Sequence, residues 1–483
     1  MGGTVARYDN NLVVIGGGSA GLIAALIAAT VRARVTLIEK GAMGGDCLNT
    51  GCVPSKTFIR SAKVAQYQRA GAEFGLRSVV PEVDFGRVMQ RVQEVIASIA
   101  PKDSMARYRE LGVDCIAGEA RLLDEHHVAV GDTVVSTRNI VLATGASPFV
   151  PPIDGLADAQ PLTSDTLWGL TELPQRLLVM GGGPIGCELA QSFARLGSQV
   201  TLIDMEDRLL PREDGDVSEF VRGAFAEQGI DVRLSHRAVR VLPRTAGAGV
   251  LQAEMATGTV DIDFDRILVA VGRRAHTQGL GLQELGIDTN ADGTVQVDDY
   301  LRTARKNIFA CGDVVGPYQF THMASHQAWY ASVNALFGRF KKFRVNYSVV
   351  PWVTYTDPEI ARVGLSEADA LERGIAVEVV RFDLAESDRA LADGTAKGWV
   401  KVLTKPGKDR ILGVSIVGPH AGELLAEFVL AMTHGLGLKK IMATIHVYPT
   451  LAEANKFAAS AWRREHAPQA LLAWVGGLHR MLR

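Results

Sequence analysis

The chain has 483 residues, of which 47% are hydrophobic, and a formal net charge of −2 at pH 7. The length exceeds what one hydrophobic core supports and predicts roughly three domains. The small net charge argues against nucleic acid and against an acidic membrane surface as partners. Five cysteines are too few for a secreted disulfide framework, so we expect a cytoplasmic protein in which any disulfide is catalytic.

Two segments near the N-terminus bear on targeting. Residues 1–11 are polar and contain no apolar stretch of the kind found in signal peptides. Residues 12–31 carry no charge and are long enough to cross a membrane. They contain four glycines near one end, however, and run into a strand-like segment at 35–39. We therefore interpret them as a buried strand, turn and helix.

The same order of elements occurs twice along the chain. Each copy predicts a strand, a glycine turn, a helix and a second strand, and equivalent residues lie 165 positions apart. The elements are expected at residues 12–15, 16–18, 19–31 and 35–38, and again at 177–180, 181–183, 184–196 and 200–203. The strands are continuously apolar, which is typical of a parallel sheet covered on both faces. The sequence therefore predicts an α/β protein with two Rossmann-like dinucleotide-binding domains.

The first copy carries the glycine fingerprint Gly16-x-Gly18-x-x-Gly21. The first glycine allows a tight turn, the second lets a pyrophosphate approach the backbone, and the third lets the helix pack on the strand. The helix N-terminus offers N–H groups and partial positive charge to the phosphates. Glu39 follows the second strand, where a carboxylate binds ribose hydroxyls.

The second copy repeats the fingerprint as Gly181-x-Gly183-x-x-Gly186, with Asp204 at the acidic position. An aspartate there binds the free 2′-hydroxyl of NADH and repels the 2′-phosphate of NADPH. Two arginines that follow closely, Arg208 and Arg212, leave NADPH open.

Cys47 and Cys52 lie in the segment GGDCLNTGCVPSK, residues 44–56. Residues five apart in a regular helix have Cα atoms about 8–9 Å apart, beyond the roughly 7 Å limit of a disulfide. Residues 49–51 must therefore distort the backbone, and Asn and Gly favour such distortion. Pro54 can begin a helix, which places Cys52 near a helix N-terminus and favours its thiolate. The alternative is a pair of unpaired buried thiols.

The remaining sequence suggests how the domains alternate. Three prolines, at 148, 151 and 152, follow an apolar strand at 140–143 and indicate a hinge, and a turn at 272–275 marks the return. From about residue 349 we expect short alternating strands, at 399–403 and 411–417, and then an apolar helix at 423–432. This pattern predicts a C-terminal α+β domain.

The segment around the cysteines resembles the active site of the pyridine nucleotide–disulfide oxidoreductases. That family includes lipoamide dehydrogenase, glutathione reductase and mercuric reductase. Three further segments resemble the family in the same chain order: ATGASP at 143–148, IFACGD at 308–313 and YPTLAE at 448–453. The resemblance covers the chain from about residue 9 to residue 465.

The resemblance implies FAD in the first copy and the nicotinamide cofactor in the second. It implies that Asp313 binds the ribityl chain and that Lys56 and Glu188 form an ion pair beside the flavin. Cys52 would be the thiol against the flavin, and Cys47 the outer thiol that attacks the acceptor. A homodimer is implied, in which the C-terminal motif, including Glu453, comes from the partner subunit. The remaining cofactor-binding residues expected from the resemblance are Ala120, Thr144, Gly145, Thr321 and Gly272.

The sequence departs from its relatives at the C-terminal motif. Lipoamide dehydrogenase and glutathione reductase carry a histidine base five residues before the motif glutamate, and Tyr448 stands there in this chain. Tyrosine, with an ordinary pKa near 10, is a weaker base at neutral pH than histidine. His446 is the alternative base, or else an orienting residue. A tyrosine at this position resembles the motif of mercuric reductase. The C-terminal cysteine pair of that enzyme is absent here, however, since Cys311 is the last cysteine.

Other residues have plainer interpretations. His322 and His326 have a spacing that metals can use, but no third ligand stands near them and we expect no metal site. His322 also matches a family position beside the flavin. Cys115, Cys187 and Cys311 lie in apolar stretches and are expected to be core thiols. The tail at 467–483 predicts an amphipathic helix that packs on the dimer, with a membrane surface as the less favoured alternative.

The sequence therefore predicts an FAD- and NADH-dependent oxidoreductase that acts through a Cys47–Cys52 disulfide. The expected acceptor is a small-molecule disulfide, a thiol or a thiol-bound metal. A dihydrolipoyl dehydrogenase and a slowly turning flavin redox sensor are the alternatives. The expected domains are FAD-binding (1–152 and 276–345), NAD(P)-binding (153–275), interface (346–466) and tail (467–483).

Overall fold

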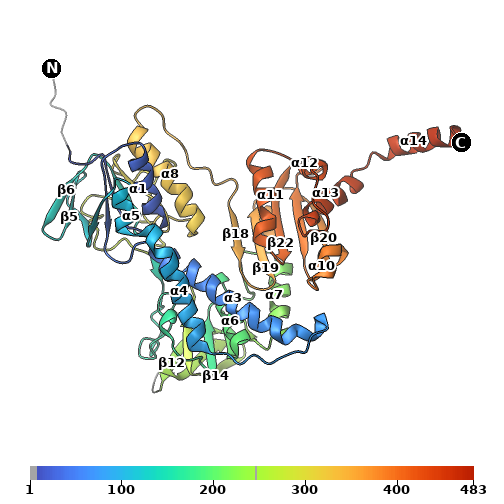
Figure 1. Ribbon diagram of the computed structural model, residues 1–483, viewed down its shortest axis with the longest axis horizontal. Helices are drawn as coiled ribbons and strands as arrows, with labels where there is room; N and C mark the ends of the chain where they lie inside the picture. Colours follow the sequence, from blue (N-terminus) through green and yellow to red (C-terminus); the bar gives the residue numbers. More distant parts are fainter. Residues whose placement is uncertain (1–7, 245–246) are drawn as a thin grey trace. The chain divides into compact units, whose positions relative to one another are not determined.

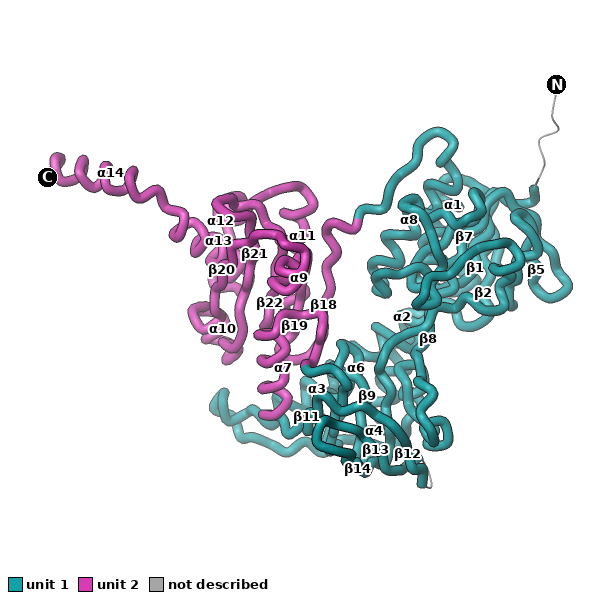
Figure 2. Tube along the Cα trace, turned by 180° about the vertical axis from the view of Figure 1, so that it is seen from behind, with its two compact units in different colours: residues 1–207, 228–346 teal, residues 208–227, 347–483 magenta. Residues whose placement is uncertain are grey.

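The computed structural model describes residues 8–244 and 247–483. The chain forms two compact units, one of residues 1–207 with 228–346 and one of residues 208–227 with 347–483 (Figure 2). Residues 1–7, on which part of the signal-peptide expectation falls, lie outside the described residues.

The first unit contains a parallel five-stranded sheet with strand order β17-β7-β1-β2-β3. Its strands are β1 (Leu12–Ile15), β2 (Val35–Glu39), β3 (Asp114–Ala117), β7 (Ile140–Leu142) and β17 (Ile308–Ala310). Helices α1 (Ser19–Thr30) and α8 (Thr321–Phe337) pack on each other and on this sheet (Figure 1). The uncharged stretch at 12–31 is thus a buried strand, turn and helix, as predicted. In the described part of the chain, no helix has the length and apolarity needed to cross a membrane.

Further elements of this unit surround that sheet. A small antiparallel sheet consists of β4 (Ala120–Leu122), β5 (His127–Val130) and β6 (Thr133–Ser136). The helices between β2 and β3 are α2 (Gly45–Asn49), α3 (Cys52–Arg69), α4 (Phe85–Asp103) and α5 (Met105–Glu110). Strands β8 (Ala146–Pro148) and β16 (Arg273–Ala275) pair antiparallel at the expected hinge and return.

The second copy of the repeat is also present in the first unit. Its parallel sheet has the order β11-β10-β9-β15. The elements are β9 (Arg176–Met180), α6 (Pro184–Leu196), β10 (Gln199–Ile203), β11 (Asp231–Arg233) and β15 (Arg266–Val269), with an antiparallel sheet of β12 (Arg237–Pro243), β13 (Gly249–Met255) and β14 (Gly258–Phe264). The predicted fold class, with two Rossmann-like domains, is confirmed.

The second unit is an α+β domain built on an antiparallel sheet with strand order β18-β19-β22-β21-β20. Its strands are β18 (Pro351–Thr354), β19 (Glu359–Gly364), β20 (Glu378–Asp383), β21 (Trp399–Thr404) and β22 (Ile411–Gly418), and its helices are α7 (Gly215–Glu227), α9 (Glu367–Glu372), α10 (Asp388–Ala392), α11 (Ala421–Thr433), α12 (Leu438–Ala443), α13 (Glu453–Glu465) and α14 (Gln469–Met481). The expected alternation of exposure is wrong for β21, because all six of its residues are buried.

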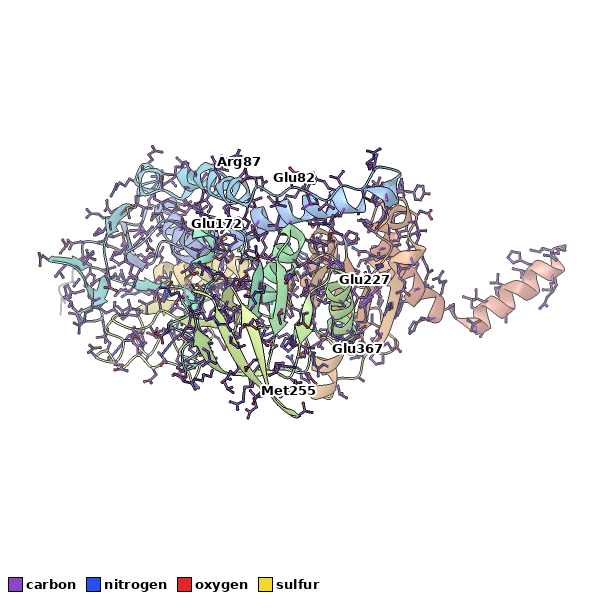
Figure 3. The ribbon with its side chains drawn as sticks, turned by 90° about the horizontal axis from the view of Figure 1, so that it is seen from below. Glu82, Arg87, Glu172, Glu227, Met255 and Glu367 are labelled. Carbon is purple, nitrogen blue, oxygen red and sulfur yellow. The ribbon has the colours of Figure 1, made fainter. Side chains whose placement is uncertain are left out.

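The burial of β21 on both faces has a clear cause. Helices α11 and α13 cover one face of the sheet. On the other face Lys401, 2% exposed, binds Asp214 at 3.0 Å, Asp216 at 2.9 Å and Glu367 at 2.7 Å. Glu367 is labelled in Figure 3. Asp216 belongs to α7, so residues 208–227 complete the C-terminal unit although they follow the second Rossmann copy in the sequence.

Candidate active site

The first and third glycines of each fingerprint are required by close backbone packing. Gly16 and Gly181 have φ of +110° and +116°, a region that favours glycine. A Cβ on Gly21 would lie 1.7 Å from the Gly16 carbonyl oxygen, and one on Gly186 would lie 1.8 Å from the Gly181 oxygen. The helix therefore touches the preceding turn in both copies, as the fingerprint predicts.

The second glycines differ because they face open space. A Cβ on Gly183 would meet nothing within 4 Å, and one on Gly18 would first meet Gly45 at 3.6 Å. These glycines cap α6 and α1, and neither helix has a capping side chain or an acidic residue in its first turn. Each turn is thus a cradle with helix N–H groups, which fits the pyrophosphate of a dinucleotide.

The two predicted ribose acids occupy equivalent places. Glu39 accepts a hydrogen bond from the Gly17 N–H at 2.5 Å, and Asp204 accepts one from the Gly182 N–H at 2.5 Å. Both carboxylates therefore stand beside the glycine turn of their own copy. The residues after Asp204 are Met, Glu and Asp, which adds negative charge at this position.

One cavity of about 450 Å³ extends from the first glycine turn to Cys47, and Cys52, the thiol expected against the flavin, does not line it. Its size and its elongated set of lining residues fit an extended ligand such as FAD. Its wall includes these predicted residues: Gly16, Gly18, Glu39, Cys47, Ala120, Thr144, Gly145, Asp313 and Thr321.

The redox segment forms two helices separated by a break. Helix α2 ends at Asn49, and Thr50 and Gly51 leave the helical conformation before α3 begins at Cys52. The carbonyl of Asp46 accepts hydrogen bonds from the N–H groups of Thr50 at 2.9 Å and Gly51 at 2.6 Å. This break brings together two thiols that a continuous helix would separate, and it places Cys52 at a helix N-terminus as predicted.

The two thiols have opposite electrostatic environments. A hydrogen bond from Cys47, together with the Thr321 hydroxyl at 3.3 Å and the charge of Lys56, lowers the pKa of Cys52 to about 6 although burial opposes this. The same thiol–thiol hydrogen bond, with burial, raises the pKa of Cys47 above its ordinary value. At neutral pH the arrangement holds Cys52 as the thiolate and Cys47 as its hydrogen-bond donor.

The ion pair expected between Lys56 and Glu188 is present. The Lys56 ammonium lies 2.9 Å from the Glu188 carboxylate, whose side chain is 6% exposed. Lys56 lies on α3, one turn after Cys52, and Glu188 lies on α6 of the second copy. The pair therefore joins the cysteine helix to the second dinucleotide-binding domain.

Sequence reasoning missed a charged network beneath the cysteines. The Arg273 guanidinium lies 2.7 Å from Asp46 and 3.8 Å from Asp313. Thr50 donates a hydrogen bond to Asp46 at 2.5 Å, and burial raises the pKa of Asp165, which also lines the cavity. Only the position of Asp46, next to Cys47, was a signal in the sequence, since the other residues are far apart along the chain.

In the second unit, Tyr448 is engaged by a carboxylate. Its hydroxyl donates a hydrogen bond to Asp388 at 3.0 Å, and this bond raises the pKa of the tyrosine above its ordinary value. Glu453 begins α13 and accepts a hydrogen bond from the N–H of Thr450 at 3.4 Å. At neutral pH Tyr448 is thus less available as the deprotonated tyrosinate than an ordinary tyrosine.

His446 has a partner on each ring nitrogen. Its Nδ1 lies 3.0 Å from the Thr444 carbonyl, and its Nε2 lies 3.0 Å from Glu427. The His446 side chain is 7% exposed, and Glu427 also accepts a hydrogen bond from Asn455 at 3.0 Å. Because both ring nitrogens are already bonded within the unit, these contacts favour His446 as a residue that orients the motif rather than as a base.

Two of the three remaining cysteines are core thiols as expected, because Cys187 and Cys311 are fully buried. Cys115 is half-buried at the edge strand β3 and packs against the core, so the core interpretation holds for it only in part. On α8, the His322 ring stacks on Phe320 and the His326 ring meets Tyr330 edge-on.

Gly272 closes the second copy of the repeat. It has φ of +138°, and a Cβ there would meet nothing within 4 Å. Its carbonyl accepts a hydrogen bond from the N–H of Phe149 at 2.9 Å, which ties together the two segments that cross at the hinge.

Comparisons with known proteins agree with this geometry. The family model described as pyridine nucleotide-disulphide oxidoreductase matches residues 10–328, and its dimerisation domain matches residues 350–459. The dimerisation domain supports the expected homodimer. Mercuric reductase of Lysinibacillus sphaericus is 34% identical over 462 residues, covering 95% of this chain and 83% of that protein. Dihydrolipoyl dehydrogenase of Chlamydia muridarum is 34% identical over 452 residues, covering 91% and 94%.

Solved structures give the same result. The Cu(II) complex of the HOCl-induced flavoprotein disulfide reductase RclA from Escherichia coli has a TM-score of 0.83 at 30% identity, covering 94% of this chain and 99% of RclA. LpdA from Mycobacterium tuberculosis has a TM-score of 0.85 at 28% identity, covering 93% and 99%. The chain therefore belongs to the pyridine nucleotide-disulphide oxidoreductase family, whose members depend on FAD and take electrons from NAD(P)H.

Proposed function

We propose that this enzyme uses NADH to reduce a soft metal ion, bound by thiolates, through the Cys47–Cys52 pair. The observation that carries the choice of acceptor is the hydrogen bond from Tyr448 to Asp388. It leaves the C-terminal motif without a competent base, and metal reduction by thiolates requires none. Small disulfides are the second acceptor class.

The cofactor roles follow from the two glycine cradles. The first copy, with Glu39 and the cavity that reaches Cys47, would hold FAD. The second copy, with Asp204, would hold NADH, since a carboxylate repels the additional phosphate of NADPH. Arg273, which binds Asp46 and approaches Asp313, would orient the carboxylate expected to bind the ribityl chain.

The Cys47–Cys52 pair would pass two electrons to the acceptor. When bound, FAD provides the two-electron relay between the nicotinamide and the sulfurs. NADH and one proton break the S–S bond and give two thiols and NAD⁺. The thiols then reduce two Cu(II) ions to Cu(I), as the S–S bond re-forms and two protons leave. A mercuric ion would instead be held by the two thiolates and would take its two electrons from the bound cofactor. Thr321 and Lys56 hold Cys52 as the thiolate, while Cys47 is the outer thiol.

The chemistry of sulfur favours a soft metal ion as the acceptor. Thiolates select soft ions such as Cu(I) over hard ones. Among the relatives, mercuric reductases are named for a soft ion, and E. coli RclA was solved as a Cu(II) complex.

Dihydrolipoyl dehydrogenase is the main alternative, because relatives with that name are as similar in sequence as the mercuric reductases. That reaction requires a base to take a proton from a substrate thiol. Neither Tyr448, bonded to Asp388, nor His446, bonded to Glu427, supports that role.

We expect the purified, FAD-loaded enzyme to oxidise NADH faster with Hg(II) in excess thiol, or with Cu(II) without added thiol, than with lipoamide or glutathione disulfide. The substitution Tyr448→His restores a base near pKa 6.5 and should increase lipoamide turnover at neutral pH by roughly 100-fold, the scale of general base catalysis. NADH oxidation in stopped assays with each acceptor measures both effects, and Tyr448→Phe is the control that adds no base. A fast wild-type rate with lipoamide would contradict the proposal. NADH reduction without turnover of any acceptor would instead favour a redox sensor.

After the hydrogen bond from Cys47, the Thr321 hydroxyl is expected to contribute to the pH at which Cys52 becomes a thiolate. In the reduced wild-type enzyme the thiolate should form as the pH rises through about 6. Thr321→Val removes a hydrogen bond to a charged sulfur, which is worth about 1.5 kcal/mol, so the pKa should rise by roughly one. The long-wavelength thiolate-to-flavin band, recorded against pH, measures this. Thr321→Ser keeps a hydroxyl and should keep the wild-type profile, whereas an unchanged profile in Thr321→Val would exclude this role.

A further inference from the structure

Helix α14 presents an apolar stripe that its own unit does not cover. Leu471, Trp474, Val475, Leu478 and Leu482 follow the spacing i, i+3, i+4, i+7, i+11 and share one helix face. No residue of α14 is buried. Trp474 is 66% exposed and Leu482 is 75% exposed. Figures 1 and 2 both show α14 beyond α13, away from the sheet of its unit.

The composition of α14 indicates that it needs a surface to fold on. It has 13 residues, and Gly476 and Gly477 stand together in its second half. Each glycine costs about 1 kcal/mol in a helix interior relative to alanine, and helices this short are marginal alone in water. An apolar stripe on such a helix is therefore a contact surface.

The position of α14 identifies the surface. The dimerisation domain matches residues 350–459, which end inside α13, and α14 begins at Gln469 after a short connection. In the same unit Ile445 is 93% exposed and Val447 is 74% exposed. Exposed apolar side chains of this kind are expected on a surface that binds a second subunit. The stripe thus continues from a domain that already binds a second copy.

We propose that α14 is an arm that docks its apolar stripe on the second copy of this chain in the homodimer. Because a two-fold dimer is isologous, both arms make the same contact and each adds to the interface. A membrane surface is the poorer match. Helices that lie on membranes carry cations along the polar face. Here Arg480, Arg483 and His479 all lie at one end of the helix, and most of the rest of the face opposite the stripe is alanine and glycine.

The test compares the dimer dissociation constant, from sedimentation equilibrium, of the full chain and of a variant ending at His466. We expect the shortened protein to dissociate at least about 100-fold more readily, since several large apolar side chains per arm lose their cover. Leu471→Gln with Leu478→Gln should act in the same direction. Ala473→Gln with Arg480→Gln, on the opposite face, should leave the dissociation constant unchanged. FAD content and circular dichroism verify that each variant is folded.

Three results would overturn the proposal. The first is an unchanged dissociation constant in the shortened protein. The second is equal weakening by both double variants, because the stripe would then have no special role. The third is flotation of the full chain, but not of the shortened one, with vesicles of phosphatidylcholine and phosphatidylserine while the dimer constant stays the same. None of these measurements depends on the acceptor, so they are independent of the proposed metal reduction.

Discussion

Replacing Cys47 or Cys52 by serine is expected to reduce acceptor-dependent NADH oxidation by roughly a thousandfold, because in the proposed function the sulfur pair is the route by which electrons leave the cofactor. A serine hydroxyl cannot form or break the S–S bond. The two variants should differ in one respect. Cys47→Ser keeps the Cys52 thiolate beside Thr321, so it should retain the long-wavelength absorbance, whereas Cys52→Ser should lose it.

Anaerobic titration with NADH measures how many electrons the enzyme stores, without an acceptor. The wild-type enzyme should accept four electrons per FAD, two of them stored in sulfur, and each serine variant should accept two. Cys115→Ser is the matched control, because its half-buried thiol contacts the carbonyl of Val113 and lies outside the cavity wall. Uptake of only two electrons by the wild type would exclude a redox-active pair and, with it, the proposed function.

The parts of the site that could be predicted from the sequence are those in which local chain chemistry determines the geometry. The glycine turns need glycine because a Cβ would clash with a neighbouring carbonyl oxygen. The spacing of the glycines in the sequence is therefore enough to predict the turn. The break at residues 49–51 follows from the reach of a disulfide. The repeat at an interval of 165 residues predicted the second parallel sheet and the helix α6 that packs on it.

The parts that could not be predicted depend on partners far apart in the chain. Arg273 meets Asp46 from 227 positions away, and Tyr448 finds Asp388 from 60 positions away. The double burial of β21 could not be foreseen, since two of the three carboxylates that bind Lys401, Asp214 and Asp216, come from residues 208–227. Periodicity reports the environment of a strand only when its two faces differ, and here they do not.

Gly186→Ala and Gly183→Ala are expected to separate folding from nucleotide binding in the second copy. At Gly186 a Cβ would lie 1.8 Å from the Gly181 oxygen, so the turn and α6 must move apart. Such overpacking costs about 1–3 kcal/mol or more, and we expect a lower melting temperature together with loss of NADH binding. At Gly183 a Cβ meets no protein atom within 4 Å, so the melting temperature should stay near that of the wild type.

NADH affinity is the property that Gly183→Ala should change. The open space at Gly183 is where the fingerprint places the pyrophosphate, and a methyl group there should weaken NADH binding by about tenfold or more. Thermal unfolding and quenching of protein fluorescence by NADH measure the two effects, and FAD content should stay constant because the first copy is untouched. The two variants should thus share weaker NADH binding and differ in melting temperature. If Gly183→Ala bound NADH as the wild type does, the cradle at the start of α6 would not be the nicotinamide cofactor site, however well the rest of the repeat is formed.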